Sequence, residues 1–456
     1  MEAREESKRL GVLRAHRRPV QLFALTAVVL IAASGWLSWH LISVANSSFV
    51  GGRFPLIFTL AFVVLAWQTW LYTMERPVRI TERQQKQVDQ LRVCVPVPVY
   101  NEDPEYLKRC LASILNQTRR PQWIYVVDDG SAVDYAPERA WLSRQAADAG
   151  IRMTWIRTVN KGKRNAQGCA VRTTAAEIDV YVTVDSDANL APNAVEELMK
   201  PLAWPDVQSV AGIVLSENSS QNLLTRIADL WFVVGQLADR SAASTMGAVL
   251  VNSGVLAAYR TDLFLDNLDG YLNETFCGRR VEFSDDSMLT IYALLRGKCI
   301  QQPTAFAFTV MPNNISHHIR QYLRWMRGAF IRTWWRFKYI PLNKYAYWSH
   351  FLGWVQMMVS TFIVLSLFVY YPLTTHHMSP FLLLVPILIG YGQALRYLTF
   401  KRNDESLGSQ LTTFAIAPLM TLWAFFVLRV VRWYGMATCL KTGWGTRSQV
   451  EIERKS

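Results

Sequence analysis

Long stretches without a charged residue constrain the fold of this 456-residue chain more than any other feature. Residues 20–52, 54–74 and 345–395 contain no Lys, Arg, Asp or Glu. About 20 apolar residues cross the hydrocarbon core of a bilayer, so the last stretch has room for two helices and a turn. Buried core helices of soluble proteins are shorter than these runs. We therefore predict an integral membrane protein.

Basic residues beside these stretches predict which ends face the cytoplasm. The loop at 46–53 has one basic residue and the turn at 372–380 has none, so both are expected outside. The polar segment between the membrane regions is then cytoplasmic, in a multi-pass protein of the plasma membrane. The N-terminus is placed inside by Arg4, Lys8, Arg9, Arg14, Arg17 and Arg18.

A fourth uncharged stretch, 406–428, carries Pro418 near its middle. A spanning helix here would leave Arg429, Arg432 and Lys441 outside, against the bias for basic residues inside. A backbone broken by proline is tolerated at membrane depth where protein covers it. We expect a re-entrant or interfacial segment followed by a cytoplasmic tail.

These features divide the chain into six parts. The helix expected near 315–339 mixes basic and aromatic residues, which is typical of an interfacial helix. Its adjacent His317 and His318 are expected to be interfacial rather than metal ligands, because nothing completes a ligand set. The parts are an N-terminus with two transmembrane helices (1–75), an α/β domain (76–312), amphipathic interfacial helices (313–344), two transmembrane helices (345–400), the Pro-broken segment (401–437) and the tail (438–456).

The net charge of +13 is accounted for by anionic lipid at the inner leaflet and an anionic substrate. No nucleic-acid-binding module is recognisable, so membrane lipid is the expected partner and nucleic acid is not. No obligate protein partner is evident. The six cysteines form no metal-like pair, and we expect reduced thiols.

Between residues 92 and 310, short β-rich runs alternate with helical ones. This alternation predicts a parallel sheet covered by helices on both faces, with ligands beyond the carboxyl ends of the strands. The strands are expected at 92–99, 122–127, 152–156 and 179–184, and the helices at 104–116, 136–149, 164–174 and 192–200.

Acidic pairs follow two of these strands. Asp128 and Asp129 end one strand, where carboxylates can accept hydrogen bonds from uracil or ribose. Asp185 and Asp187 alternate after another, so that one can hold Mg²⁺ or Mn²⁺ while the other contacts ribose. Such a cation bridges two phosphates and stabilises the leaving diphosphate. We predict a nucleotide and metal site here.

Three further motifs carry chemistry. Around a glycine at 160–167, Lys161, Lys163 and Arg164 open a helix, which suits a diphosphate, although a solvated helix start has the same pattern. In the segment 284–286, a carboxylate can deprotonate an acceptor hydroxyl. In the segment 321–325, Gln321, Arg324 and Trp325 share one helical face. There Arg324 can pair with phosphate, and Trp325 offers a platform for a sugar ring.

The order of these motifs (VDDGS, NKGKRNAQ, DSD, SDD and QYLRW) resembles processive family-2 glycosyltransferases, which include cellulose, chitin and hyaluronan synthases. The resemblance covers about 92–336 and extends to the flanking membrane architecture. Ser253 and Gly254 lie in a segment similar to the SGPL acceptor segment of hyaluronan synthases, and the closing GWGTR resembles the tail of bacterial ones. The resemblance implies a GT-A, Rossmann-like cytoplasmic domain inserted between transmembrane helices.

The resemblance also implies residue roles. Asp286 would be the acceptor base with Asp285 beside it, and Asp187 would contact the metal. UDP would be bound by Asp128, Lys163, Asp187, Arg324 and Trp325. A gating role would fall to Trp444, Thr446 and Arg447. The chain departs from the family pattern at Ser284 for the Gly of GDD, Ser287 for the following Arg, Val255 for the Pro of SGPL and Asn252 for a common Cys.

We therefore expect a processive inverting enzyme that polymerises UDP-GlcNAc and UDP-GlcA into hyaluronan and extrudes the polymer through its own channel. A chitin-type or other β-linked polysaccharide synthase is the nearest alternative. A non-processive glycosyltransferase acting on a lipid carrier is a further one. A catalytically inactive membrane scaffold would have lost carboxylates, whereas all the acidic motif positions are present.

Overall fold

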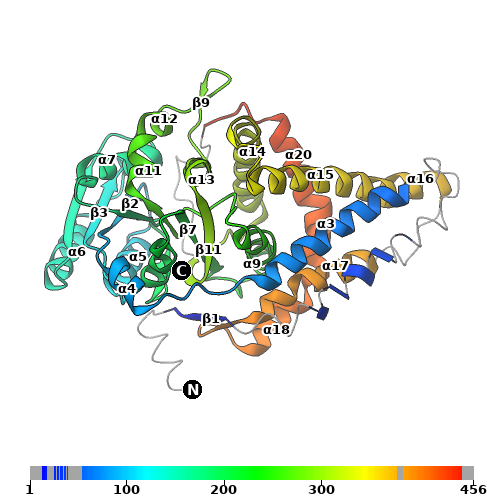
Figure 1. Ribbon diagram of the computed structural model, residues 1–456, viewed down its shortest axis with the longest axis horizontal. Coiled ribbons are helices and arrows are strands. Elements are labelled where there is room, and N and C mark those ends of the chain that lie inside the picture. Colours follow the sequence, from blue (N-terminus) through cyan, green and yellow to red (C-terminus); the bar gives the residue numbers. More distant parts are fainter. Residues whose placement is uncertain are drawn as a thin grey trace.

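The structure is a computed structural model that describes residues 13–17, short pieces between 25 and 39, 54–376 and 384–443. An α/β domain occupies one side of Figure 1, and long apolar helices extend from the other. The predicted gating residues Trp444, Thr446 and Arg447 lie outside the described residues, so their role stays a prediction.

The α/β domain is built on an eight-stranded sheet with the order β4-β3-β2-β5-β8-β7-β11-β6. Four of its strands are parallel: β2 (Val93–Val99), β3 (Trp123–Asp128), β4 (Arg152–Arg157) and β5 (Val180–Thr183). These are the four strands that the sequence predicts. Alternate residues of β2 belong to different cores, Val95 to one and Cys94 to the other, as expected for a sheet covered on both faces.

The other half of the sheet corrects the prediction of a purely parallel arrangement. β8 (Ala257–Arg260) runs antiparallel between β5 and β7 (Val207–Ser216). β11 (Lys298–Thr309) is parallel to β7, and β6 (Asn189–Leu190) is antiparallel at the edge. Because β8 is reversed, the turn before it lies at the carboxyl ends of its neighbours.

The predicted helices of the first half are confirmed as α5 (Pro104–Leu115), α6 (Ala136–Asp148), α7 (Lys163–Thr174) and α8 (Ala194–Met199). The Asp103 side chain caps α5 by accepting a hydrogen bond from the backbone N–H of Glu105, and Pro104 occupies the first helical position. Each cysteine, all of them in the described ranges, is a free thiol.

Further helices complete the domain and lead to the membrane region. They are α9 (Leu223–Gly235), the π-helical η3 (Gln236–Arg240), α10 (Ser241–Thr245), α13 (Asp285–Arg296) and α14 (Ile315–Tyr339). The bounds of α14 agree with the predicted interfacial helix.

The apolar helices include α3 (Phe54–Met74), α15 (Tyr345–Leu365) and α17 (Leu384–Ala394). Within the described residues, Tyr345–Thr374 and Ala417–Ala437 form helices long and apolar enough to cross a membrane. Only 6% of the most apolar window of the first is buried, whereas the core helix of a soluble protein is mostly buried. The number and direction of crossings remain predictions.

Pro418 interrupts the last apolar stretch. α18 (Leu407–Ala415) ends just before it. A continuous helix then follows through Ala417–Ala437, made of α19 (Ala417–Trp423), the π-helical η7 (Ala424–Leu428) and α20 (Arg429–Ala437). Arg226 of the α/β domain donates to the Thr413 hydroxyl near the start of this segment. Just after its end, Cys439 packs in a cluster with side chains of the same domain. Both ends of the segment therefore contact the α/β domain.

The segments that flank the apolar helices are fixed to the same domain. β1 (Ala15–Arg17) pairs antiparallel with β12 (Phe400–Arg402). The buried Arg396 forms an ion pair with Glu75 at 3.4 Å and lies over the Tyr72 ring. These contacts join the end of α3, the N-terminal strand and the chain after α17.

Candidate active site

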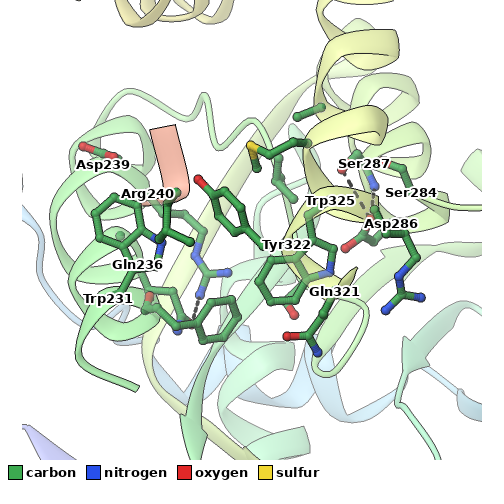
Figure 2. Close-up of a pocket in the computed structure, with 18 of the residues that line it drawn as sticks. Trp231, Gln236, Asp239, Arg240, Ser284, Asp286, Ser287, Gln321, Tyr322 and Trp325 are labelled. Carbon is green, nitrogen blue, oxygen red and sulfur yellow. Dashed lines mark hydrogen bonds between the residues drawn. The ribbon is translucent and has the colours of Figure 1, made fainter. Parts of the chain in front are cut away.

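A cavity of about 1000 Å³ lies along the carboxyl edge of the sheet and continues between the α/β domain and the apolar helices. Figure 2 shows part of its wall, with Asp286 and Ser284 on one side of Gln321 and Trp325. Every predicted motif contributes to the wall at least one residue that sequence analysis selected. These residues are Asp129, Lys163, Asp185, Asp187, Ser253, Gly254, Asp285, Asp286, Gln321, Arg324 and Trp325.

The reversed strand β8 explains how Ser253 and Gly254 reach this site. Ala257 pairs with Thr183 at the carboxyl end of β5, so the preceding turn lies beside Asp185. A Cβ at Gly254 would approach the Lys163 Nζ to 3.1 Å. Glycine therefore allows this backbone to lie close to the charged groups.

Lys163 links two of the acidic motifs. Its Nζ donates to Asp185 Oδ1 at 2.6 Å and lies 3.4 Å from Asp285 Oδ2. Burial opposes the charge of Lys163, but Asp185 and Asp285 outweigh it and raise the pKa of the amine. Burial likewise favours neutral Asp285, but Lys163 and Arg164 outweigh it and lower the pKa of that carboxyl. Asp285 is thus held as an anion in an ion pair.

Asp286 has a different environment from its neighbour. Its Oδ1 accepts the Ser287 backbone N–H at 2.6 Å, and its Oδ2 accepts the Gly254 N–H at 3.3 Å. Burial and the adjacent Asp285 raise the pKa of Asp286 to about 6. A carboxylate that lines the cavity with a pKa near neutrality suits general-base chemistry.

The loop that presents these carboxylates is strained at Ser284. This residue has φ +61° and ψ +40°, the left-handed region, immediately before α13. Non-glycine residues adopt this conformation at a cost of about 1–2 kcal/mol. Gly328 of α14 lies against it, and a Cβ at Gly328 would come within 2.8 Å of Ser284 Cβ.

The position of Arg164 does not agree with its predicted role as a diphosphate ligand. Its guanidinium is buried away from the cavity and donates to Glu274 at 2.6 Å and to the Phe283 carbonyl at 2.9 Å. Glu274 also pairs with Arg332 of α14, which donates to the Ser284 carbonyl at 3.0 Å. Arg164 is therefore not retained as a diphosphate ligand. This buried cluster instead joins α7, α14 and the segment just before Asp285 and Asp286.

The two carboxylates of the first acidic motif bind mainly backbone N–H groups of the protein itself. Asp128 is buried, and its Oδ1 accepts the Ser131 N–H at 2.8 Å. Asp129 accepts the backbone N–H groups of Lys161 and Gly162 at 2.8 and 2.7 Å, which fixes the loop before Lys163. Of the described residues, the cavity wall includes Asp129 but neither Asp128 nor the exposed Lys161.

Asp187 and Asp185 are the residues that would hold a divalent cation. Burial, Glu102 and Asp185 raise the pKa of Asp187 to about 8, and Thr309 Oγ1 donates to its Oδ2 at 3.0 Å. In the described part of the chain, no three His, Cys, Asp or Glu side chains are grouped as a metal site. Mg²⁺ in nucleotide sites uses one or two carboxylates, with phosphate and water as the other ligands. The donor set fits that mode.

The α14 helix presents Gln321, Arg324 and Trp325 to the cavity, as the spacing predicts. Trp325 stacks on Phe232 of α9, with ring centroids 5.8 Å apart and planes at 26°. The residue remains 37% exposed, so part of its surface is available to a ligand.

Sequence reasoning missed Glu274, Arg332 and the cavity residues of α9 and η3. Arg332 resembled any basic residue of an interfacial helix, and Glu274 stood outside the acidic motifs. A buried acidic residue between motifs has no sequence signal, because its partners are set by tertiary packing.

Comparison with known proteins agrees with this geometry. Residues 94–267 match Glycosyl transferase family 2, and residues 181–431 match Glycosyl transferase family group 2. The chain is 33% identical over 364 residues to the hyaluronan synthase of Streptococcus pyogenes, covering 79% of this chain and 84% of that protein. It is 37% identical over 256 residues to an N-acetylglucosaminyltransferase of Sinorhizobium fredii, covering 56% and 61%.

A solved structure shows a similar fold. A mannosyltransferase from Pyrobaculum calidifontis in complex with GDP-Man and Mn²⁺ has a TM-score of 0.52 and 18% sequence identity. The likeness covers 86% of this chain and 96% of that one. It supports a fold of the GT-A type for the α/β domain.

Proposed function

Since the chain belongs to the family-2 glycosyltransferases, we propose that it is a processive inverting synthase that polymerises UDP-GlcNAc and UDP-GlcA into hyaluronan. The observation that carries the proposal is the continuous cavity. It contains Asp286, Asp187 and Trp325 at one end and side chains of α15, α19 and α20 further along. A glycan elongated at one end would therefore lie between apolar helices at the other.

The proposed reaction is a single displacement at the anomeric carbon of the donor sugar. Asp286 accepts the proton of the acceptor hydroxyl as the new C–O bond forms and UDP leaves. A divalent cation, Mg²⁺ or Mn²⁺, would be held by Asp187 and Asp185 and would supply charge neutralisation at the leaving diphosphate. Arg324 binds phosphate and Trp325 supports a sugar ring.

Asp128 and Asp129 are proposed to shape the nucleotide site, with Asp129 acting through the backbone of the Lys161–Gly162 loop. Lys163 would contact the diphosphate after exchange of its present partner Asp185. Ser253 and Gly254 would contact the acceptor, because Gly254 is hydrogen-bonded to the proposed base.

We further propose that the protein is a multi-pass plasma-membrane enzyme with a cytoplasmic catalytic domain. Along α15 the cavity wall includes the uncharged Gly353, Gln356, Met357 and Ser360. Small and amide side chains such as these can contact hydroxyl-rich sugars. The contacts of both ends of 407–439 with the domain support the re-entrant assignment.

A chitin-type synthase is the second candidate, favoured by the identity to the rhizobial N-acetylglucosaminyltransferase. The test is UDP release by the purified protein in nanodiscs, with each UDP-sugar alone and with both together. Strict dependence on UDP-GlcNAc plus UDP-GlcA supports the hyaluronan proposal. Sustained release from UDP-GlcNAc alone overturns it in favour of the chitin-type reaction. Short products attached to lipid would instead indicate a non-processive enzyme.

A further inference from the structure

Two arginines of the cavity wall, Arg336 of α14 and Arg429 of α20, have no carboxylate partner in the described part of the chain. Arg336 donates to the Leu250 carbonyl at 2.7 Å, and its Nε has no hydrogen-bond acceptor. Arg429 donates to the hydroxyls of Ser360 and Thr361 at 3.0 and 2.8 Å, and its Nε is also without an acceptor.

These contacts differ from those of Arg164, Arg332 and Arg432. Arg240 of the same wall also binds only neutral oxygens, but its Nε is bonded to Gln301. Arg164 and Arg332 are neutralised by Glu274. Burial raises the pKa of Asp239, and the nearby charge of Arg432 partly opposes that effect. Arg336 and Arg429 bind only neutral oxygen atoms, which compensate a buried guanidinium less well than an anion does.

The burial of Arg336 makes this lack of an anion costly. The residue is 5% exposed, and burial together with Arg332 lowers the pKa of its guanidinium to about 9 against the opposing effect of Asp286. A charged group that lines a cavity and is bonded only to a neutral carbonyl oxygen is suited to bind an anionic ligand.

The two arginines lie at different depths of the same cavity. Arg336 is close to His350 near the start of α15, while Arg429 binds Ser360 ten residues further along that helix. At the rise of an α-helix this difference is about 15 Å. Between them the wall includes the uncharged Gly353, Gln356 and Met357. The cationic groups are thus spaced along the route from Asp286 toward the apolar helices.

We propose that Arg336 and Arg429 bind carboxylates of uronic acid residues in the growing glycan, so that the cavity selects an anionic polymer over a neutral one. The inference rests on the proposed function, because it takes the cavity to hold the product. A uronate bound at Arg336 would fix the register of the chain at the reaction site. The acceptor hydroxyl of the terminal sugar would then face Asp286.

The test compares two ligands that differ only in charge. A hyaluronan oligosaccharide and the same oligosaccharide with its carboxyl groups reduced to alcohols are titrated onto the full-length protein in nanodiscs. The wild type should bind the acidic ligand about tenfold more tightly or better, as expected for an ionic hydrogen-bonded pair. Arg336→Gln and Arg429→Gln should each reduce that ratio, and the double variant should abolish it.

Lys338→Gln is the matched control, because Lys338 is an exposed cation on the same helix as Arg336. It should retain the wild-type ratio. Should Arg336→Gln fail to fold, Arg336→Lys keeps the charge without the planar fork and should retain part of the preference. Equal binding of the two ligands by the wild type overturns the inference, as does an unchanged ratio in the double variant.

UDP release separates this inference from the proposed function. Suppose that the wild type needs both donors but the arginine variants keep the wild-type ratio of affinities for the two oligosaccharides. The proposed function then stands, and only the assignment of the arginine site is overturned. A wild type that polymerises UDP-GlcNAc alone overturns the function itself. In that case equal binding of the two oligosaccharides is also expected.

Discussion

The contact between Gly328 and Ser284 leads to a prediction about catalysis that the structure allows us to work out in detail. A methyl group at position 328 would meet Ser284 Cβ at 2.8 Å, Ser284 Oγ at 3.0 Å and Phe283 Cδ2 at 3.3 Å. Ser284 cannot move freely, because its carbonyl accepts from Arg332 and its backbone is already in the left-handed region. Gly328→Ala should therefore displace the loop that carries Asp286.

The expected change in the free energy of unfolding is the sum of two opposing contributions. Overpacking of this kind costs about 1–3 kcal/mol, whereas replacing glycine by alanine within a helix gains about 1 kcal/mol. The net change in the free energy of unfolding is therefore small. Catalysis is more sensitive, since a 1 Å misplacement of a reacting group can cost about a hundredfold in rate. We expect Gly328→Ala to lower kcat by about ten- to a hundredfold with a nearly normal melting temperature.

Ser284→Gly should rescue this variant. The substitution removes both atoms nearest to the new methyl group and relieves about 1–2 kcal/mol of backbone strain. Alone it should be close to the wild type, and with Gly328→Ala it should restore kcat to within about threefold, a coupling of the size measured for residues in contact. Gly408→Ala is the control, because a Cβ there would meet no atom within 4 Å.

The assay is UDP release at saturating donor concentrations, with thermal unfolding measured on the same preparations. Equal losses in Gly328→Ala and in the double variant would refute the reasoning. The same conclusion would follow if Gly408→Ala lost as much activity as Gly328→Ala.

The remaining predictions concern the base and its pH dependence, the metal and the topology. Asp286→Asn should retain UDP affinity by calorimetry while radiolabelled polymer falls at least about a hundredfold, and retained synthesis there with an inactive Asp285→Asn would move the base to Asp285. In the wild type the rate should fall as the pH drops through about 6, because Asp286 is then protonated and cannot accept a proton; a flat profile down to pH 5 would contradict this. Asp187→Asn should abolish turnover in a folded protein, and EDTA should inhibit the wild type reversibly with Mn²⁺ or Mg²⁺; full activity in excess chelator would exclude the metal. Cys439 is packed in a cluster, so the topology test uses the exposed position 441: Lys441→Cys, in a protein whose own cysteines are replaced by Ser, should react with an impermeant thiol reagent only from the cytoplasmic side, whereas labelling of intact cells would make 406–428 a membrane span.

The first half of the sheet could be predicted because its signals are local. Each of its strands is a buried β-rich run next to a helix with its own periodicity, and the turns between them carry recognisable motifs. β8 has no such signal. Its four residues, Ala257–Arg260, alternate in no pattern, and its direction is set by pairing with β5 and β7.

The site could be predicted by residue type but not by partner. Lys163 and Arg164 are adjacent cations at the start of one helix, yet one reaches the cavity and the other is buried. The difference depends on Glu274, which is 110 residues away from Arg164 in the sequence. Periodicity places Gln321 and Trp325 on one face of α14, but only packing reveals that Gly328 lies against Ser284.

The pairing of β1 with β12 constrains the number of membrane crossings between these two strands. Residues hydrogen-bonded to each other are on the same side of a bilayer, so the predicted crossings between Arg17 and Phe400 would have to be even in number. Glu75, paired with Arg396 just before β12, would split that count into two parts that are each even. A variant that lost a single crossing could not invert the rest of the protein, because inversion would separate β1 from β12. Misinsertion should therefore unfold the enzyme rather than give it a second orientation.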